Sequence, residues 1–430
     1  MHDRRRFLMQ SAALVAGAVA HHVAAAAAAP APRNGHPRVV VVGGGYGGAT
    51  AARYLRLWSD GKVAVTLVES NPAFVSCPLS NLVLGGSKSI DDLTVSYGNL
   101  ARRHGVRVVR DTAMAIDPDK RNVRLAGGST LPFDRVVLSP GVDFLWSQIP
   151  SLDNDDVRSR ILHAWKAGPQ TVALRRQLEA MPDGGVFAIA IPVAPFRCPP
   201  GPYERACQVA WYLRRAKPKS KVLILDGNPE ITSKPALFRR AFDEEYKGMI
   251  EYRANQTLTD VDAATRTAKF ELDDPVQADV LNVIPPQSAG AIARAAGVIT
   301  ANDRWCEVDF TTMESIKVPN VHVLGDAIQI APNMPKSGHM ANQQAKVCAA
   351  AILALLAGEA VDPAPVMNNT CYSFITDQDA VHVASVHQYD AAKKTMMPVS
   401  GAGGLSPAMN ALEGTYGLAW AQSIWADMLA

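Results

Sequence analysis

The chain has 430 residues, a formal net charge of +3 and six cysteines. This weak charge, with no basic run interleaved with aromatic residues, excludes a nucleic-acid-binding surface. The roughly four hundred residues that follow the N-terminal segment are enough for two or three domains. Six cysteines are too few for a disulfide scaffold, although an oxidising compartment allows specific pairs.

The N-terminus has the three parts of a bacterial export signal. Arginines at positions 4–6 precede an uncharged stretch over 11–20 and an alanine run over 24–29. A charged start, a short apolar core and a small-residue cleavage region predict a signal peptide over residues 1–31. The paired arginines before Phe7 and Leu8 indicate the twin-arginine route, and therefore a periplasmic protein. The alternative is a membrane anchor, but a spanning helix needs ~20 apolar residues, so stable membrane insertion is not expected.

The first predicted fold element is a dinucleotide-binding turn. Residues 38–42 are a continuous apolar run, typical of a strand buried on both faces. A glycine-rich turn follows, and residues 49–58 are predicted to form a helix. Gly43 permits the tight turn, Gly45 lets the backbone approach a diphosphate, and Gly48 allows close packing of helix on strand. The diphosphate is expected at the helix N-terminus.

A second predicted strand, residues 63–68, ends at Glu69. An acid at this distance from the glycines is expected to bind the ribose hydroxyls. Strand, glycines, helix, strand and acid in this order strongly predict a dinucleotide site.

Two later segments favour FAD over NAD as the ligand. Residues 321–326 are predicted to form a strand ending in Gly325 and Asp326, which in flavoproteins with two dinucleotide folds places the aspartate on the ribityl chain. Residues 135–141, ending at Gly141, resemble the strand and glycine turn that re-enter the FAD domain in the same families. Either segment alone could be an ordinary strand and turn, but together they favour FAD.

The middle of the chain predicts a second wound domain that lacks a second nucleotide. A strand over 186–191, a helix over 203–216 and a strand over 221–226 have the outline of a βαβ unit. The connecting loop 192–202 contains one glycine and five prolines, and prolines remove the N–H donors that a phosphate needs. We therefore expect an electron donor other than NAD(P)H, and a structural role for Asp226.

Cys77 is the only cysteine in the segment that passes the flavin ring in related folds. Disulfide reductases of the glutathione reductase type have two cysteines four residues apart there, so that mechanism is not available at this position. A single thiol near the dimethylbenzene edge could instead be attached covalently to the flavin.

The other five cysteines differ in their surroundings. Cys198 lies in the proline loop, and Cys371 lies far away in the sequence. Free cysteines usually pack as small hydrophobic residues, and this interpretation is applied to Cys207, Cys306 and Cys348.

Several segments are similar to the flavoprotein subunit of flavocytochrome c sulfide dehydrogenase. The match is spread over most of the chain and includes residues 194–206, 285–287, 335–338 and 369–372. Sulfide:quinone oxidoreductases share the fold less closely. The resemblance implies that Cys77 carries FAD through a thioether and that Cys198 and Cys371 form a redox-active disulfide. It also implies that Glu204 is a candidate acid/base near that disulfide and that Lys336 lies at the cofactor.

The resemblance also implies a mechanism and a partner. Hydrosulfide attacks the disulfide and leaves a persulfide on one cysteine and a thiolate on the other. Electrons then pass to the flavin, which the helix beginning near Ser337 stabilises with its positive end. No Cys-x-x-Cys-His haem site occurs in the chain, so a separate c-type cytochrome subunit is expected to form a heterodimer with it. The region after Asp362, with Trp420 and Trp425, could dock that subunit, or its tryptophans could cap the protein's own core.

The predicted fold class is α/β, with two Rossmann-like domains of the glutathione reductase type and a C-terminal α+β interface domain. Residues 37–150 and 285–360 are expected to form the two parts of the FAD domain. Residues 151–284 form the second domain without nucleotide, and residues 361–430 form the interface domain.

Two other functions compete with sulfide oxidation through a cytochrome. A sulfide:quinone oxidoreductase would need a membrane-facing apolar helix near the C-terminus, and residues 417–430 are only weakly amphipathic. A non-catalytic electron-transfer subunit would keep the flavin fold but lack turnover. No metal site is predicted.

Overall fold

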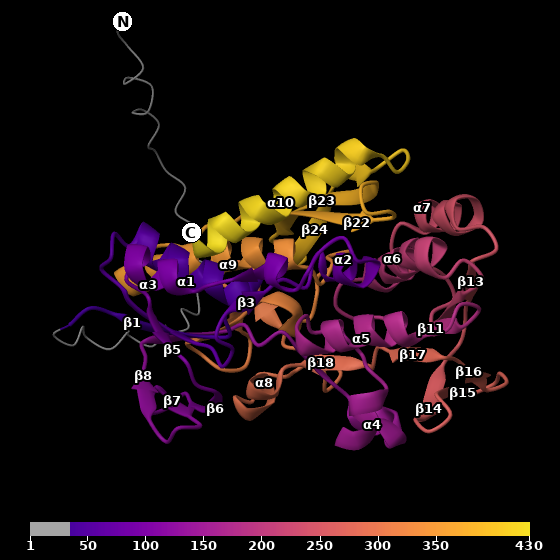
Figure 1. Ribbon diagram of the computed structural model, residues 1–430. Coiled ribbons are helices and arrows are strands. Elements are labelled where there is room, and N and C mark those ends of the chain that lie inside the picture. The colour runs from indigo at the N-terminus through magenta and orange to yellow at the C-terminus, as the bar shows by residue number, and fades with distance from the viewer. Residues whose placement is uncertain (1–34) are drawn as a thin grey trace, which may run out of the picture. The chain divides into compact units, whose positions relative to one another are not determined.

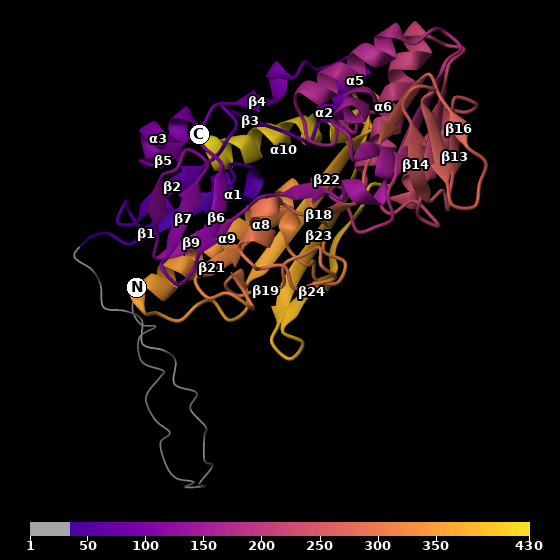
Figure 2. The same ribbon diagram turned by 90° about the horizontal axis from the view of Figure 1, so that it is seen from below.

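The computed structural model describes residues 35–430, and residues 36–430 form one compact unit. The predicted signal peptide over 1–31 lies outside the described residues. The fold of the compact unit is shown from two sides (Figures 1 and 2).

The first sheet has seven strands in the order β19-β20-β21-β9-β1-β2-β5. The strands are β1 (Arg38–Val42), β2 (Ala64–Val68), β5 (Arg107–Val109), β9 (Arg135–Leu138), β19 (Val308–Asp309), β20 (Glu314–Ser315) and β21 (Val321–Val323). From β21 to β5 all neighbours are parallel, and β19 and β20 extend the edge as an antiparallel pair. Burial of β1 and β9 on both faces explains their continuous apolar sequences.

Helices α1 (Tyr46–Trp58) and α9 (Gly338–Ala357) pack against each other beside this sheet. The helix after the first strand begins at Tyr46, three residues before the predicted start. Among residues 35–430, α9 alone is long and apolar enough to span a membrane, and half of its most apolar stretch is buried inside the protein. This burial is typical of a core helix.

The second sheet is fully parallel, in the order β13-β12-β11-β17. Its strands are β11 (Val186–Ile191), β12 (Lys221–Asp226), β13 (Ile250–Arg253) and β17 (Val280–Val283), with helices α5 (Pro169–Ala180), α6 (Gly201–Ala216) and α7 (Pro235–Arg240). The helix predicted over 203–216 begins two residues earlier, at Gly201. Pro202 is tolerated there because a first-turn N–H has no partner within the helix.

The C-terminal segment forms an antiparallel sheet and a helix. Its elements are β22 (Val366–Phe374), β23 (Ala380–Asp390), β24 (Thr395–Leu405) and α10 (Ala411–Leu429). Strand β22 contacts both α9 and α6, so it links the two wound domains. Helix α10, yellow in Figure 1, packs on α1, β22 and β23.

Smaller elements connect these layers. One antiparallel meander consists of β6 (Ala113–Asp117), β7 (Asn122–Leu125) and β8 (Thr130–Pro132), and a second consists of β14 (Leu258–Asp262), β15 (Thr267–Phe270) and β16 (Val276–Gln277). Two strand pairs are β3 (Phe74–Val75) with β4 (Thr94–Val95) and β10 (Val142–Phe144) with β18 (Gln287–Ala289). The short helices are α2 (Ser80–Gly85), α3 (Gly98–His104), α4 (Asp155–Arg160) and α8 (Ala291–Ala295).

The predicted α/β class is confirmed, with two Rossmann-like sheets and a C-terminal α+β segment. Trp420 and Trp425 pack against the chain's own core. The indole N–H of Trp425 also donates a hydrogen bond to the Tyr46 hydroxyl at 3.1 Å. These contacts agree with the core-capping alternative for the two tryptophans.

Candidate active site

The glycine turn between β1 and α1 has the geometry of a dinucleotide site. A Cβ added to Gly48 would lie 1.8 Å from the carbonyl oxygen of Gly43, and a Cβ on Gly43 would lie 2.3 Å from that of Ser139. Gly43 also has a φ of +96°. Next to Gly45, by contrast, there is no heavy atom within 4 Å of an added Cβ. Gly43 and Gly48 are therefore required by packing, while Gly45 leaves open space where a phosphate could approach the backbone.

Glu69 lies at this turn, at the end of β2. Its Oε2 accepts a hydrogen bond from the Gly44 N–H at 2.7 Å, and its Oε1 accepts from the Asn71 backbone at 2.7 Å. The structure thus places the acid beside the glycines. Its bond to ribose stays a prediction.

The other FAD segments meet the first turn across the sheet. Gly141 and Gly325 have φ values of +65° and +75°, and both follow strands adjacent in the first sheet. Asp326 follows Gly325 in a single 3-10 turn over Gly325–Ala327. Its Oδ1 is buried and has no hydrogen-bond partner within the described residues. A buried acceptor without a donor is costly, and a ribityl hydroxyl would supply the missing donor.

Lys336 binds the backbone around Asp326. Its Nζ donates to the carbonyl oxygens of Asp326 at 2.8 Å and Ile328 at 2.6 Å, and lies 3.6 Å from the Trp305 ring centroid. Burial lowers the pKa of Lys336 to about 7. The lysine therefore holds the Asp326 turn in place, and its direct contact with a cofactor stays a prediction.

The corresponding turn of the second domain has few donors to offer a phosphate. After β11, the N–H of Ala194 donates to Asn228 Oδ1 at 2.9 Å, and the N–H of Gly227 donates to the Ile191 carbonyl oxygen at 3.0 Å. A cavity of about 280 Å³ lies at this edge, lined mainly by apolar side chains and by Arg304.

Asp226 ends β12 where a ribose-binding acid would stand. Its Oδ2 accepts from the hydroxyls of Tyr203 at 2.7 Å and Tyr252 at 3.1 Å, while its Oδ1 accepts from the backbone and side-chain N–H groups of Asn228. These four donors satisfy the carboxylate, which agrees with its predicted structural role.

Cys198 lies in the proline loop, directly before α6. Its backbone has a φ of +56°, uncommon for a residue other than glycine. Its N–H donates to the Lys336 carbonyl oxygen at 2.9 Å, which joins the proline loop to the segment before α9. A Cβ on Gly201 would lie 3.0 Å from Cys198 Sγ. The missing side chain at Gly201 therefore makes room for the thiol.

Cys371 reaches the same place from β22. Its thiol donates to Asn369 Oδ1 at 3.4 Å, and this oxygen also accepts from Ser337 Oγ at 2.6 Å. Ser337 caps the N-terminus of α9 through the Met340 N–H. Cys371 is thereby tied to the positive end of that helix.

Cys198 and Cys371 are joined by hydrogen bonds to neighbouring residues before α9, Cys198 to Lys336 and Cys371 through Asn369 to Ser337. Burial raises the pKa of Cys198, and the Cys371 thiolate raises it further. Burial also raises the pKa of Cys371, while Lys234 lowers it. Both are free thiols in the structure, so their disulfide stays a prediction.

Glu204 lies in the first turn of α6, 6 % exposed. Its Oε1 accepts from the Phe374 N–H and its Oε2 from Asn81 Nδ2, both at 2.9 Å. Burial raises its pKa above the ordinary value. Its charge raises the pKa of both Cys198 and Cys371, and its hydrogen bond from Phe374 ties it to the strand that carries Cys371.

Cys77 contacts the loop that precedes α5. Its Sγ accepts from the Ala167 N–H at 3.5 Å. Burial lowers the pKa of Arg197, but the acidic groups of Cys77, Asp326 and Cys198 outweigh burial and raise it. One guanidinium thus interacts with three of the predicted site residues.

Three family models match this chain. They describe the central part of the sulfide dehydrogenase [flavocytochrome c] flavoprotein chain over residues 171–285, its flavin-binding part over 363–429, and pyridine nucleotide-disulphide oxidoreductases over 37–171. The flavoprotein chain from Chlorobaculum thiosulfatiphilum is 61 % identical over 38 residues, which are 9 % of this chain and 77 % of that sequence.

The chain belongs to the flavocytochrome c sulfide dehydrogenase flavoprotein family. It is thus a flavoprotein of a sulfide-oxidising oxidoreductase family.

More distant relatives agree with this assignment. The mitochondrial sulfide:quinone oxidoreductase of Dictyostelium discoideum is 23 % identical over 301 residues, 68 % of this chain and 64 % of that protein. The chain therefore spans less than two thirds of that relative. The solved structure of the Aquifex aeolicus sulfide:quinone oxidoreductase superposes with a TM-score of 0.74 and 20 % identity, covering 91 % of each chain. Putidaredoxin reductase gives a TM-score of 0.65, and both likenesses show a shared fold.

The remaining cysteines of this family member are fully buried. Cys207, Cys306 and Cys348 have no exposed surface and belong to hydrophobic clusters. This agrees with their interpretation as small core residues.

Two cations, Arg197 and Lys234, were not predicted from the sequence. Arg197 stood inside the predicted loop, and its position next to Cys198 was a usable signal. Lys234 follows β12 and meets Cys371 only in the folded protein, so no local pattern marks it.

Proposed function

We propose that this chain oxidises hydrosulfide through a Cys198–Cys371 disulfide and FAD, and passes the electrons to a separate c-type cytochrome subunit. The observation that carries the proposal is that Cys198 and Cys371 are both joined by hydrogen bonds to the segment directly before α9, Cys198 to Lys336 and Cys371 through Asn369 to Ser337. Family membership supports sulfide as the substrate.

The donor set fits FAD. The turn at Gly43, Gly45 and Gly48 would hold the diphosphate, Glu69 the ribose, and the unpaired Oδ1 of Asp326 a ribityl hydroxyl. FAD, when bound, accepts an electron pair from the cysteines and releases it to an acceptor.

The reaction at the cysteines balances as follows. One hydrosulfide attacks Cys198 Sγ, the disulfide breaks, and the products are a Cys198 persulfide and a Cys371 thiolate. A second hydrosulfide attacks the outer sulfur of the persulfide, and the bond between that sulfur and Cys198 Sγ breaks. The two sulfurs leave together as HSS⁻, and Cys198 becomes a thiol again. Glu204 accepts the thiol proton, and the two cysteines close to the disulfide as two electrons leave. The sum is two HS⁻ giving HSS⁻, one proton and two electrons.

Anaerobic sulfide titration of the flavin absorbance tests this function. Cys198→Ser and Cys371→Ser should each abolish bleaching by sulfide, because the disulfide cannot form. Cys306→Ser is the matched control at a buried cysteine outside the thiol pair, and it should bleach as the wild type does. Bleaching of Cys198→Ser at the wild-type rate would contradict the proposal.

Covalent attachment of FAD through Cys77 is a second part of the proposal. It is supported by the interaction of the Arg197 charge with both Cys77 and Asp326, which raises the pKa of the arginine. Acid-denatured wild-type protein should retain the mass of FAD, and the Cys77→Ala variant should not. Release of all flavin from the wild type by acid would contradict the attachment.

The acceptor and the compartment are further parts of the proposal. A quinone is the rival acceptor, and the similarity to sulfide:quinone oxidoreductases favours it. The signal peptide predicted over residues 1–31 supports export to the periplasm, where c-type cytochromes reside. Turnover with a c-type cytochrome but not with a soluble quinone analogue is expected, and the opposite preference would establish the rival.

A further inference from the structure

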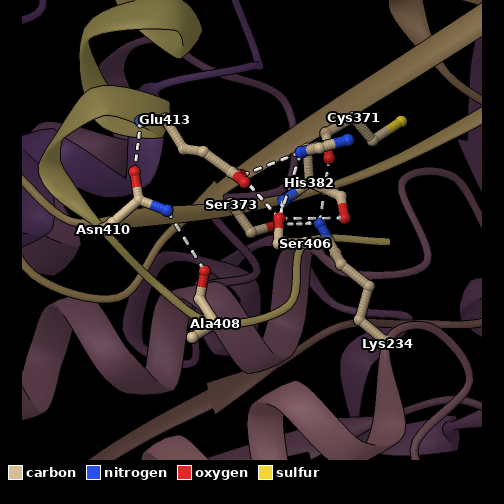
Figure 3. A network of polar contacts seen from close by, with 8 residues as sticks. All are labelled: Lys234, Cys371, Ser373, His382, Ser406, Ala408, Asn410 and Glu413. Carbon is tan, nitrogen blue, oxygen red and sulfur yellow. Dashed lines mark hydrogen bonds and ion pairs between the residues drawn. The ribbon is translucent and has the colours of Figure 1, made fainter. Parts of the chain in front are cut away.

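Lys234 is a buried cation that the reaction above does not use. It stands directly before α7 with a φ of +55° and is 3 % exposed. Its Nζ donates to the Cys371 carbonyl oxygen at 2.9 Å and to Ser373 Oγ at 2.8 Å. Figure 3 shows the lysine reaching these two residues of β22, with the Cys371 sulfur directed away from the ammonium group.

Both hydrogen-bond acceptors of Lys234 are neutral. No carboxylate lies within ion-pair distance of its Nζ in the described part of the chain. A buried ammonium without a paired anion is unfavourable, and burial lowers the pKa of Lys234 to about 8.

Four acidic groups, each on a different element of the fold, interact with Lys234. In decreasing order of their effect, the Cys371 thiolate, Glu204 on α6, Cys198 in the proline loop and Glu413 on α10 favour the charged lysine. Glu413 is itself engaged, since its Oε2 lies 2.8 Å from His382 Nδ1 and accepts from Ser406 (Figure 3). The anion that interacts most strongly with the lysine is therefore the one that forms when Cys371 is released.

We propose that Lys234 is a positioning residue that makes Cys371, rather than Cys198, the leaving thiolate when the disulfide is opened. It holds the backbone of Cys371 through the carbonyl and supplies a cation in a water-poor site. This inference rests on the proposed function.

The chemistry follows from the leaving-group rule of thiol–disulfide exchange. The sulfur with the lower thiol pKa leaves faster, so the attacking sulfur adds to its partner. Lys234 acts on Cys371 more than on Cys198, and Asn369 and Ser337 lower the pKa of Cys371 further. Hydrosulfide therefore attacks Cys198, the S–S bond breaks, and its electron pair stays on Cys371.

The test measures thiolate formation directly, without sulfide. The flavin-containing protein is reduced with dithiothreitol, desalted anaerobically and alkylated with iodoacetamide over the neutral and alkaline range, with Cys371 quantified by peptide mass spectrometry. Lys234→Met should raise the apparent pKa of Cys371 by about 1 to 3 pH units, the usual effect of losing a nearby opposite charge. Lys234→Arg should not raise the pKa of Cys371. Above pH 8, where the lysine loses its charge and arginine does not, this variant should form more Cys371 thiolate than the wild type.

Lys346→Met is the control, because Lys346 lies on α9 in an ion pair with Asp427 and is not among the groups that shift the pKa of Cys371. The Cys371 titration should be unchanged in that variant. An unchanged titration in Lys234→Met would overturn the proposal. If Lys234→Met does not fold, a Lys234→Arg titration identical to the wild type above pH 8 would overturn it instead.

The two proposals can fail separately. A raised Cys371 pKa in Lys234→Met supports the role of the lysine even if sulfide does not bleach the wild-type flavin, and that second result would refute only the sulfide reaction. If sulfide does bleach the flavin, the pH dependence of the bleaching rate in Lys234→Met should shift to higher pH by the same amount as the pH dependence of Cys371 alkylation.

Discussion

The turn after β1 and the turn after β11 start from the same topology, a buried parallel strand that leads into a helix. In the first turn, packing requires Gly43 and Gly48, while Gly45 leaves open space for a diphosphate. In the second turn, prolines and internal hydrogen bonds replace the free donors, and the loop carries Cys198 instead. The βαβ fold is thus repeated, but the ligand chemistry depends on the residues of each turn.

The largest expected effect concerns the first turn. In Gly48→Ala the new Cβ would lie 1.8 Å from a backbone oxygen. We expect a loss of about 1–3 kcal/mol or more in the free energy of unfolding, together with loss of flavin. Denaturant unfolding and flavin content per chain are the measurements.

Gly45→Ala is the matched variant for this turn, since its Cβ meets no atom of the protein. We expect near wild-type stability but reduced flavin content, because the methyl group occupies the space of the diphosphate. If both variants lose the same amount of stability and of flavin, Gly48 is not required by packing more than Gly45, and the distinction between the two glycines is wrong.

The next effect concerns the second turn and the helix that follows it. Glu204→Gln should slow the reduction of flavin by sulfide about 10²-fold, the lower end of the usual contribution of a general base. Burial raises the pKa of Glu204 above the ordinary value of a glutamate. The carboxylate that accepts the proton is therefore formed only as pH rises through this raised value, and the wild-type rate should rise with it.

The Glu204→Gln variant should lose this acidic limb, which stopped-flow reduction at several pH values would reveal. If the acidic limb of the pH–rate profile lies at the same pH in the wild type and in the variant, another group causes it, and Glu204 is not the proton acceptor of the reaction.

The smallest effect concerns Asp226, at the position of a ribose-binding acid. Asp226→Asn should destabilise the fold by about 1–3 kcal/mol, because the donors of Tyr203, Tyr252 and Asn228 lose a charged acceptor. Flavin reduction by sulfide should not change, and NADH should reduce the flavin in neither protein. Reduction of the wild type by NADH would show that the second domain does bind a nicotinamide.

Local sequence patterns predicted the fold well because strand, turn and helix signals lie within short segments. The strand over 38–42, the glycine turn and the strands over 186–191 and 221–226 were all visible in this way. The starts of α1 and α6 were placed too late, since glycine, tyrosine and proline in a first turn weaken the helix signal.

The candidate site was less accessible to sequence reasoning. Cys198 stood out because its loop replaces a nucleotide turn, whereas Cys371 rested on family resemblance. Lys234 could not be found, because its effect depends on the hydrogen bonds of its Nζ to Cys371 and Ser373, which lie far away in the sequence. Residues that act through distant contacts leave no periodic pattern in the sequence.

The central claim, that Cys198 and Cys371 are the redox pair, is tested most directly by peptide mapping of the oxidised protein under non-reducing conditions. We expect a disulfide-linked peptide containing Cys198 and Cys371, which disappears when excess sulfide is added anaerobically and returns when the electron acceptor is supplied. Two freely alkylated thiols at Cys198 and Cys371 in the oxidised, sulfide-reactive protein would contradict the account.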